Sequence, residues 1–308
     1  MSVQREYKLM LHPTPFYTGC RHANLERYWR DCLNPAVERT PGADWGGRSF
    51  QRDQDRDIRF YDQLGGRTAL LRGAGYVLRE RVKLREEPRP QDRQVTLKYR
   101  HRDYGRVALK DLSGLAANKP KTKIEADIGV RHDGCGRPRP LRCRYAHSTN
   151  QDLDEALALD RLSQPMALFP GLSKGLQEER QPADPGARLD LVSGLEVRER
   201  LFEGPEARLA GAKVGFSLAL WFDRRADPEL TAPLLAELSY KLTPKDLEKG
   251  VSAIDAAERL FTNLQDPEFF NPASMTKTAF VYAYANRPQP LQGAASGHGS
   301  PSLLARSA

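Results

Sequence analysis

The stretch at residues 76–84, YVLRERVKL, decides the fold, because apolar and basic side chains alternate along it. One face carries Leu78, Val82 and Leu84, and the other carries Arg79, Arg81 and Lys83. A two-residue period with one polar face is typical of a half-buried antiparallel strand. The sequence therefore predicts a strand here, with its basic face turned away from the apolar core.

The same alternation recurs along the chain. It is clear in residues 3–10, 94–100, 123–130, 195–202, 213–223 and 234–242, and weaker in 57–62 and 140–146. Seven or more short strands separated by turns favour a barrel or a sandwich. We expect a β-dominated α+β fold, built as a closed or nearly closed antiparallel β-barrel (a tunnel) with peripheral helices.

Helical patterns fall between the strands, at residues 22–33, 151–162 and 243–264. We expect these helices to cover the apolar outer faces of the barrel. Residues 1–285 are expected to form a single domain. Residues 286–308, which are rich in Gly, Ser, Pro and Ala, have the composition of a disordered tail.

The composition narrows the range of partners. Of the 308 residues, 39% are hydrophobic and 29% are charged, and the formal net charge is +8. This balance is typical of a soluble globular protein and favours anionic ligands. No apolar run approaches the roughly 18–20 residues that span a bilayer, and the N-terminus is charged where a signal peptide would be apolar. We expect a cytoplasmic protein without a membrane partner.

The cysteines do not indicate a zinc site. There are four, Cys20, Cys32, Cys135 and Cys143, and none forms a C-x-x-C pair. A structural zinc site would need closer spacing. We expect buried free thiols.

The polar faces of the strands carry the candidate chemistry. In chain order they present Gln4, Glu6 and Lys8, then Arg79 and Arg81, Lys98, Glu125 and Asp127, Arg198 and Arg200, and Glu237. Any one of these faces could be the solvated outer face of a sandwich. Taken together, they alternate basic and acidic groups from strand to strand.

This ordered set resembles the CYTH, or triphosphate tunnel metalloenzyme, superfamily. The motifs are QREYK (4–8), FYDQ (60–63), AGYVLRER (74–81), VTLK (95–98), IEADI (124–128), VRER (197–200), WFD (221–223) and AELSY (236–240). They follow the superfamily's order of an E-x-E-x-K strand, an L-R-x-R strand, a T-x-K strand, an acidic strand, a basic strand and a late Glu-bearing strand. The resemblance spans roughly residues 3–265.

The resemblance implies a role for each inward side chain. The triphosphate would be bound by Lys8, Arg79, Arg81, Lys98, Arg198 and Arg200. Mg²⁺ or Mn²⁺ would be held by Glu6, Glu125, Asp127 and Glu237, and the catalytic groups would be Glu6, Lys8 and Lys98. The chemistry agrees, because a polyanion needs several guanidinium and ammonium groups and these hard cations prefer oxygen ligands.

Two positions depart from the superfamily pattern. Gln4 stands where the first glutamate of the opening motif belongs, and Ser239 stands where a late second carboxylate is often found. Gln4 can form hydrogen bonds but adds no charge. Asp223 and Lys241 could compensate. Metal affinity could fall, and phosphate binding could survive without hydrolysis.

The sequence leaves four candidate functions. The leading hypothesis is a metal-dependent phosphohydrolase acting on inorganic tripolyphosphate, a nucleoside triphosphate or thiamine triphosphate. A class IV-type adenylate cyclase would use the same cations. A non-catalytic binder of polyphosphate or triphosphates is favoured by Gln4 and Ser239. An RNA-binding β-domain fits the basic charge but lacks the aromatic stacking pattern of such surfaces, so nucleic acid is not expected as a partner.

Overall fold

Eleven strands of the described residues form one sheet in the order β2-β9-β10-β11-β1-β6-β7-β5-β4-β3-β8. The computed structural model describes residues 3–17, 22–47, 49–66, 68–130, 141–154, 156–181, 183–228, 230–272 and 275–284. The strands are β1 (Gln4–Leu11), β2 (Ala43–Trp45), β3 (Gln51–Asp62), β4 (Tyr76–Leu84), β5 (Arg93–His101), β6 (Lys121–Val130), β7 (Leu141–Asp152), β8 (Asp190–Leu191), β9 (Val197–Leu209), β10 (Ala212–Asp223) and β11 (Leu235–Leu242).

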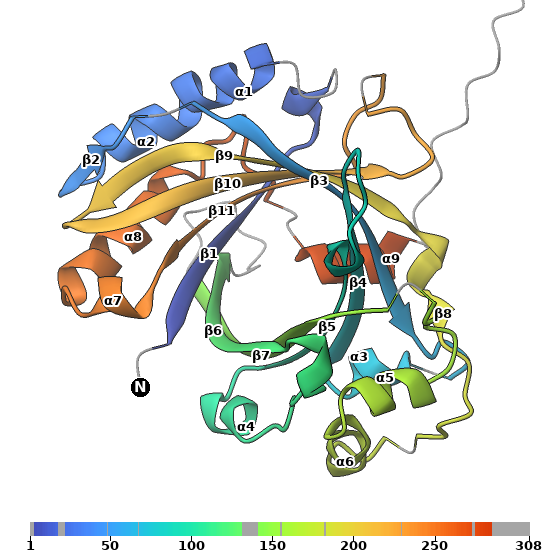
Figure 1. Cartoon of the computed structure of the whole chain (residues 1–308). Helices are drawn as coiled ribbons and strands as arrows, with labels where there is room; N and C mark the ends of the chain where they lie inside the picture. Colours follow the sequence, from blue (N-terminus) through green and yellow to red (C-terminus); the bar gives the residue numbers. More distant parts are fainter. Residues whose placement is uncertain are drawn as a thin grey trace, which may run out of the picture.

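The sheet closes on itself. β3 pairs with β9 as well as with β4, so nine of these strands form a ring, seen end-on in Figure 1. Neighbouring strands of the ring are antiparallel except β1 and β6, which pair in parallel. The β-dominated tunnel expected from the sequence is therefore confirmed, with one parallel pair added. In such a ring, side chains alternate between the lumen and the outside.

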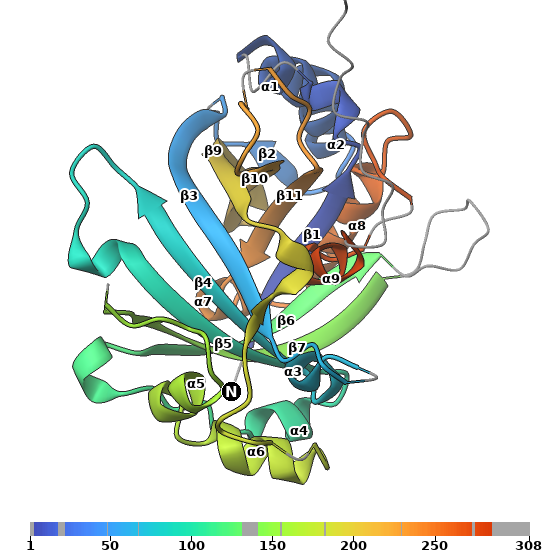
Figure 2. The same cartoon turned by 90° about the vertical axis from the view of Figure 1, so that its right-hand side faces the viewer.

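Helices cover the outside of the ring in two groups, at opposite sides in both views (Figure 1, Figure 2). Beside β1, β10 and β11 lie α1 (His22–Tyr28), the π-helix η2 (Trp29–Leu33), α2 (Asn34–Glu38), α7 (Pro244–Leu247) and α8 (Val251–Asn263). Beside β4 and β5 lie α3 (Leu70–Gly73), α4 (Tyr104–Ala108), α5 (Ser163–Leu168) and α6 (Leu172–Glu178). Short 3₁₀ turns lie at Thr14–Phe16, Pro90–Asp92, Ala116–Asn118 and Val192–Gly194.

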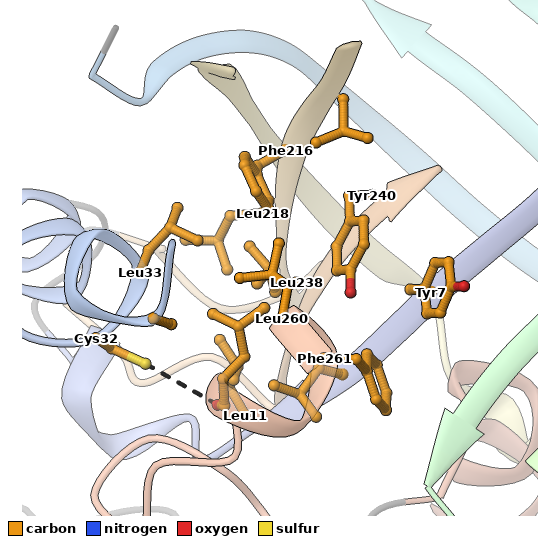
Figure 3. Close-up of a cluster of buried hydrophobic side chains, with 14 of the residues drawn as sticks. Tyr7, Leu11, Cys32, Leu33, Phe216, Leu218, Leu238, Tyr240, Leu260 and Phe261 are labelled. Atoms are coloured by element: carbon orange, nitrogen blue, oxygen red, sulfur yellow. Dashed lines mark hydrogen bonds between the residues drawn. The ribbon is translucent and has the colours of Figure 1, made fainter. Parts of the chain in front are cut away.

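The larger outer core shows why the strand faces point as they do. Tyr7 of β1 and Tyr240 of β11 stack outside the ring with centroids 4.9 Å apart, and Phe261 of α8 packs on Tyr7 (Figure 3). Burying these apolar faces under helices removes their surface from water and is the main source of stability. The alternate residues of the same strands must then face the lumen.

A final helix, α9 (Lys277–Tyr284), lies at one end of the ring. Phe280 and Val281 are buried against a small cluster that includes Phe60 and Trp221 from the inner face. The Tyr282 hydroxyl donates to Asp62 Oδ2 at 2.5 Å and ties the helix to β3. The sequence patterns did not predict this helix, which brings residues 275–278 to the wall of the lumen.

The prediction of a helix at residues 151–162 is wrong. β7 runs through Asp152, and the next helix is α5 at Ser163–Leu168. Thr149 and Asn150 are residue types that can cap a helix, but their side chains bond across strands instead, since Thr149 meets Thr122 Oγ1 at 2.8 Å and Thr96 donates to Asn150 at 2.8 Å. Cross-strand partners therefore outweigh local capping at this point.

Other expected elements differ in length. The weak candidate 57–62 belongs to the twelve-residue strand β3, and residues 141–146 of the candidate 140–146 belong to the twelve-residue strand β7. The helix expected over 243–264 divides into α7 and α8 at Gly250, whose φ of 101° is left-handed and favours glycine. The helix expected over 22–33 is confirmed in position but becomes a π-helix and runs on into α2.

Cys32 is a buried free thiol, as expected, whereas Cys143 is exposed, so that part of the expectation is wrong. The expectations for Cys20, Cys135 and the tail at 286–308 lie outside the described residues. Within the described part of the chain, every helix is too short or too polar to span a membrane.

Candidate functional site

The inner face of the ring encloses a cavity of about 570 Å³. Eight residues singled out from the sequence line it: Glu6, Lys8, Arg79, Arg81, Lys98, Glu125, Asp127 and Glu237. They come from β1, β4, β5, β6 and β11, so strands far apart in sequence are brought together. The central geometric expectation, that the polar faces turn toward a shared lumen, is confirmed for these residues.

Three carboxylates form an acidic trio on one wall of the cavity. Glu6, Glu125 and Asp127 each offer an oxygen within 4.8 Å of the others. The parallel pairing of β1 and β6 produces this arrangement, because it sets Glu6 opposite Asp127 and Gln4 opposite Glu125. A donor set made only of carboxylate oxygens fits Mg²⁺ or Mn²⁺, so these three residues could hold the expected metal ion.

Two lysines sit against the acidic trio. Lys8 Nζ lies 2.6 Å from Asp127 Oδ1 and 2.9 Å from Glu6 Oε2. Lys98 forms an ion pair with Glu125 and lies 3.4 Å from Asp127 Oδ2. The ammonium groups therefore balance the carboxylates when no other cation is bound.

The charge pattern sets the protonation of these groups. Burial would raise the pKa of Glu125 and Asp127, but Lys98 and Lys8 hold both pKa values well below the usual range. Burial lowers the pKa of Lys98 to about 8, and Arg100 acts in the same direction. Burial would also lower the pKa of Lys8, but Asp127 and Glu6 raise it overall.

Two arginines on β4 face the lumen with unsatisfied donors. The Nε atoms of Arg79 and Arg81 are buried, and neither has a hydrogen-bond partner among the described residues. Burial and the nearby Arg56 lower the pKa of Arg79 to about 10. Burial, Arg79 and Arg56 lower the pKa of Arg81 well below its usual value. A buried donor without a partner costs free energy, so an anionic ligand would relieve both arginines.

Glu237 does not join the acidic trio. Its Oε1 lies 3.0 Å from Lys277 Nζ, and the same ammonium lies 3.1 Å from Glu199 Oε1. Glu199 also accepts a hydrogen bond of 2.8 Å from Trp221 Nε1 and forms an ion pair with Arg56. The expected set of four metal ligands thus divides into the trio and Glu237, which is joined through Lys277 to Glu199.

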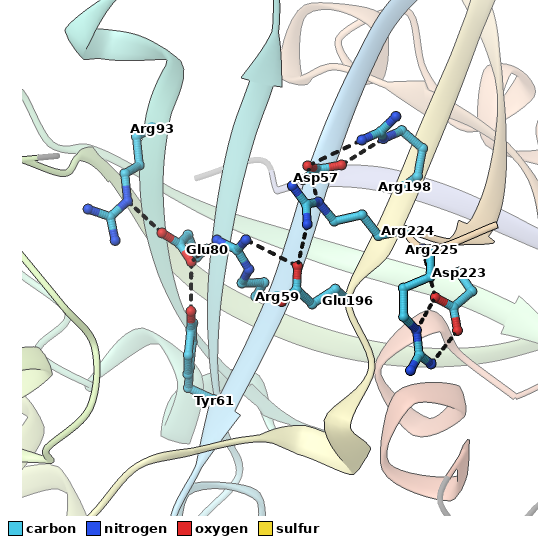
Figure 4. Close-up of polar contacts among 10 residues, drawn as sticks. All are labelled: Asp57, Arg59, Tyr61, Glu80, Arg93, Glu196, Arg198, Asp223, Arg224 and Arg225. Atoms are coloured by element: carbon cyan, nitrogen blue, oxygen red, sulfur yellow. Dashed lines mark hydrogen bonds and ion pairs between the residues drawn. The ribbon is translucent and has the colours of Figure 1, made fainter. Parts of the chain in front are cut away.

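Arg198 and Arg200 do not line the cavity, so their expected place in the site is wrong. Arg198 Nε donates to Asp57 Oδ1 at 2.7 Å in a network on the outside of the ring (Figure 4). Arg200 lies 3.7 Å from Asp55 and over the ring of Phe222. The physical reason is strand parity, because a shift of one residue exchanges the two faces of a strand. Glu199 is the inward residue of the VRER motif.

The departures from the superfamily pattern have distinct places. Ser239 and Lys241 line the cavity, whereas Gln4 lies outside the set of lining residues. Asp223 pairs with Arg225 at 2.8 Å at the end of β10 and does not compensate for a missing carboxylate in the lumen. The expectation that Asp223 compensates is therefore wrong. Lys241 remains a candidate contact for a ligand in the cavity.

Sequence reasoning missed several charged residues of the cavity wall, among them Arg56, Arg100 and Lys277, and it missed Glu199, which pairs with Lys277. Arg56 was missed because β3 was predicted to begin at residue 57. Arg100 continues the inward face of Thr96 and Lys98, so the alternation itself could have found it. Lys277 lay outside every predicted element, and no sequence signal placed it near β9.

The segment GLSKG at 171–175 matches the G-x-S-x-G pattern of serine hydrolases, but its setting does not fit. The nucleophile of such enzymes sits on a turn between a strand and a helix. Ser173 lies within α6, which follows another helix. Packing explains both glycines, because a Cβ at Gly171 or Gly175 would meet Asp111 or Tyr76. The motif therefore carries no function here.

Comparison with known proteins gives similarity at the level of structure. No protein-family model and no curated protein sequence matches the chain. The proposed adenylyl cyclase HpAC1 from Hippeastrum, described as having a dominant triphosphatase activity, aligns with 93% of this chain and 98% of its own, at 13% identity and a TM-score of 0.41. A proposed adenylate cyclase from Vibrio parahaemolyticus aligns over 92% and 99%, at 10% identity and a TM-score of 0.30.

Both TM-scores lie below 0.5, so the two likenesses add no argument about activity. The ring of strands and the ordered inward motifs are the ground for the resemblance to triphosphate tunnel metalloenzymes. What the cavity binds must be inferred from its own side chains.

Proposed function

We propose that this chain is a divalent-metal-dependent phosphohydrolase that binds a triphosphate in its tunnel. Candidate substrates are inorganic tripolyphosphate, a nucleoside triphosphate and thiamine triphosphate. One observation carries the proposal: the buried Nε atoms of Arg79 and Arg81, without partners among the described residues, share a cavity with an all-oxygen acidic trio. A phosphate chain bound to a hard cation satisfies both groups.

Each part of the lumen has a chemical role in this proposal. Arg79 and Arg81 would donate to non-bridging phosphate oxygens and fix the register of the chain. Glu6, Glu125 and Asp127 would hold Mg²⁺ or Mn²⁺, which when bound polarises the phosphoryl group and the attacking water. Lys8 and Lys98, released from the trio as the metal ion binds, would donate to the oxygens of the transferred phosphoryl group.

The reaction is the hydrolysis of a phosphoric anhydride. Water forms one new P–O bond, and the bond from the same phosphorus to the bridging oxygen breaks. Inorganic tripolyphosphate would yield orthophosphate and diphosphate. A carboxylate of the trio would orient the water and accept its proton. Loss of that proton to solvent after product release would restore the carboxylate and its ion pair with an ammonium.

Phosphate release from tripolyphosphate, ATP and thiamine triphosphate tests the proposal, with Mg²⁺, Mn²⁺ or EDTA. We expect turnover of at least one substrate that needs the metal and is lost in Arg79→Ala. The absence of turnover with every substrate and both metals would overturn the enzyme assignment. Cyclic AMP formed from ATP in the same assay would instead identify a cyclase.

A second function, non-catalytic binding of triphosphates or polyphosphate, is favoured by one observation. Lys8 and Lys98 already occupy the acidic trio, and Gln4 lies outside the lining. A binder would show tight tripolyphosphate binding by calorimetry in EDTA, without turnover in any metal. The cytoplasmic location expected from the charged N-terminus stays a prediction.

A further inference from the structure

Two buried carboxylates face the lumen away from the acidic trio. Glu199 of β9 is fully buried, and Glu237 of β11 is 7% exposed. The two strands flank β10, where Trp221 pairs with Glu199 and Ala219 pairs with Glu237. Ala219, which has a small side chain, lines the cavity beside Glu237. Two like charges buried this close to one another require a cation between them.

Lys277 supplies a cation to both carboxylates, in addition to the ion pair that Arg56 forms with Glu199 alone. Its Nζ lies 3.1 Å from Glu199 Oε1 and 3.0 Å from Glu237 Oε1, and 5.2 Å from the centre of the Trp221 ring. The ammonium is delivered by the first residue of α9, and Phe280 and Val281 anchor that helix in the inner cluster. The packing of α9 therefore holds the ammonium in place, whereas a free metal ion would have to bind from solution.

The chemistry of this pair would otherwise suit a divalent ion. Carboxylate oxygens from two strands converge on one point, which is the donor type that Mg²⁺ and Mn²⁺ prefer. The Lys277 ammonium at that point neutralises the carboxylates. Unlike a bound metal ion, it is attached to the chain and cannot dissociate into solution. It also keeps Glu237 from acting with Glu6, Glu125 and Asp127.

We propose that Lys277 is a built-in cation that takes the place of a second divalent ion between Glu199 and Glu237. The tunnel then binds one divalent ion, at the acidic trio. Its second cation is the ammonium group of Lys277, which is part of the chain. The count of one rests on the proposed function, because it assumes that the trio binds metal. The masking of the Glu199–Glu237 pair by Lys277 does not depend on it.

The test counts bound Mn²⁺ by electron paramagnetic resonance during titration of the full-length protein. We expect one ion in the wild-type protein and two in Lys277→Met. Lys277→Arg keeps the charge and should still bind one. Adding Glu237→Gln to Lys277→Met should remove the gained ion. Because Trp221 adjoins the pair whereas Trp29 and Trp45 pack in the outer core, the gained Mn²⁺ should also quench part of the tryptophan fluorescence.

Folding is checked separately by circular dichroism and by the melting temperature. Without metal, Lys277→Met should melt at a lower temperature than the wild-type protein, and Mn²⁺ should restore much of the loss. Should Lys277→Met not fold, Lys277→Gln retains a hydrogen-bond donor and serves in its place.

The outcomes separate this inference from the proposed function. Two ions in the wild-type protein, or one ion in both wild-type and Lys277→Met, would overturn the inference while leaving the metal-dependent enzyme intact. No ion in either protein would overturn both proposals. No ion in the wild-type protein and one in Lys277→Met would support the inference and show that the acidic trio binds no metal ion.

Discussion

Lys8 Nζ lies 2.6 Å from Asp127 Oδ1 across the parallel pair of β1 and β6. The same register sets Glu6 opposite Asp127, so one ammonium and two carboxylates from distant parts of the sequence meet at one level of the tunnel. Because successive side chains of a strand alternate between faces, a shift of one residue would turn Lys8 and Glu6 out of the lumen. The candidate metal site therefore depends on this register.

Replacing Asp127 with asparagine should weaken metal binding. The amide would keep the shape of the side chain but lose its charge, and even substitutions beside metal ligands cost about 10–100-fold in affinity. We expect the Mn²⁺ affinity of Asp127→Asn to fall by at least about tenfold in the resonance titration. The matched control is Glu203→Gln, which lines the same cavity and accepts a hydrogen bond from Ser217 at 3.0 Å. Equal losses in both variants would contradict a localised site.

Replacing Arg81 with methionine should stabilise the ligand-free protein and weaken ligand binding. Arg81 is repelled by Arg79 and Arg56, and its buried Nε has no partner in the described structure. An apolar side chain of similar length removes both penalties. We expect a higher melting temperature in Arg81→Met, together with an affinity for tripolyphosphate reduced about 10- to 100-fold by calorimetry. A lower melting temperature with unchanged affinity would show that Arg81 is structural.

Replacing Arg198 with methionine should lower the stability of the protein and leave ligand binding unchanged. Arg198 and Arg224 both pair with Asp57, which is 5% exposed, on the outside of the ring (Figure 4). Losing one partner of a buried carboxylate costs about 1–3 kcal/mol. We expect Arg198→Met to unfold at a lower urea concentration and to bind tripolyphosphate like the wild-type protein. A large loss of affinity here would return Arg198 to the binding site.

Metal-free binding should depend on pH through Lys98. Burial and Arg100 lower the pKa of Lys98 to about 8, so the ammonium is present below this pH and is lost above it. A polyanion favours the protonated form. We therefore expect the tripolyphosphate affinity in EDTA to fall as the pH rises from 7 to about 9.5. Lys98→Arg stays charged over this range, and its affinity should change less steeply. Parallel pH profiles for the two proteins would exclude Lys98 as the titrating group.

Much of the tunnel could be predicted from alternation alone. In β1, β4, β5, β6 and β11 the two faces differ clearly in polarity, so the inward places of Lys8, Arg79 and Lys98 followed directly. The VRER motif was ambiguous, because Val197 and Leu201 share a face with Glu199. A comparison with β3 could have resolved it, since Asp55 and Asp57 are the natural cross-strand partners of Arg200 and Arg198.

The remainder depended on contacts that local sequence does not encode. Closure of the ring pairs β3 with β9, which lie more than a hundred residues apart. The place of Lys277 follows from the burial of Phe280 and Val281 against side chains of several different strands and turns. Residues 151–152 look helical in isolation, but they extend a strand because β5 offers Val95 and Gln94 as partners. Tertiary pairing decides such segments.

The position of β1 between β6 and β11 has a consequence for biosynthesis. Of the strands in this sheet, β1 is translated first, and its two neighbours lie at residues 125–128 and 236–242. Until both are made, Tyr7, Leu9 and Leu11 stay uncovered and both edges of β1 can pair with other chains. Ring closure is a late event with long-range contacts, which slows folding. The nascent chain should therefore need protection from aggregation until β11 has been translated.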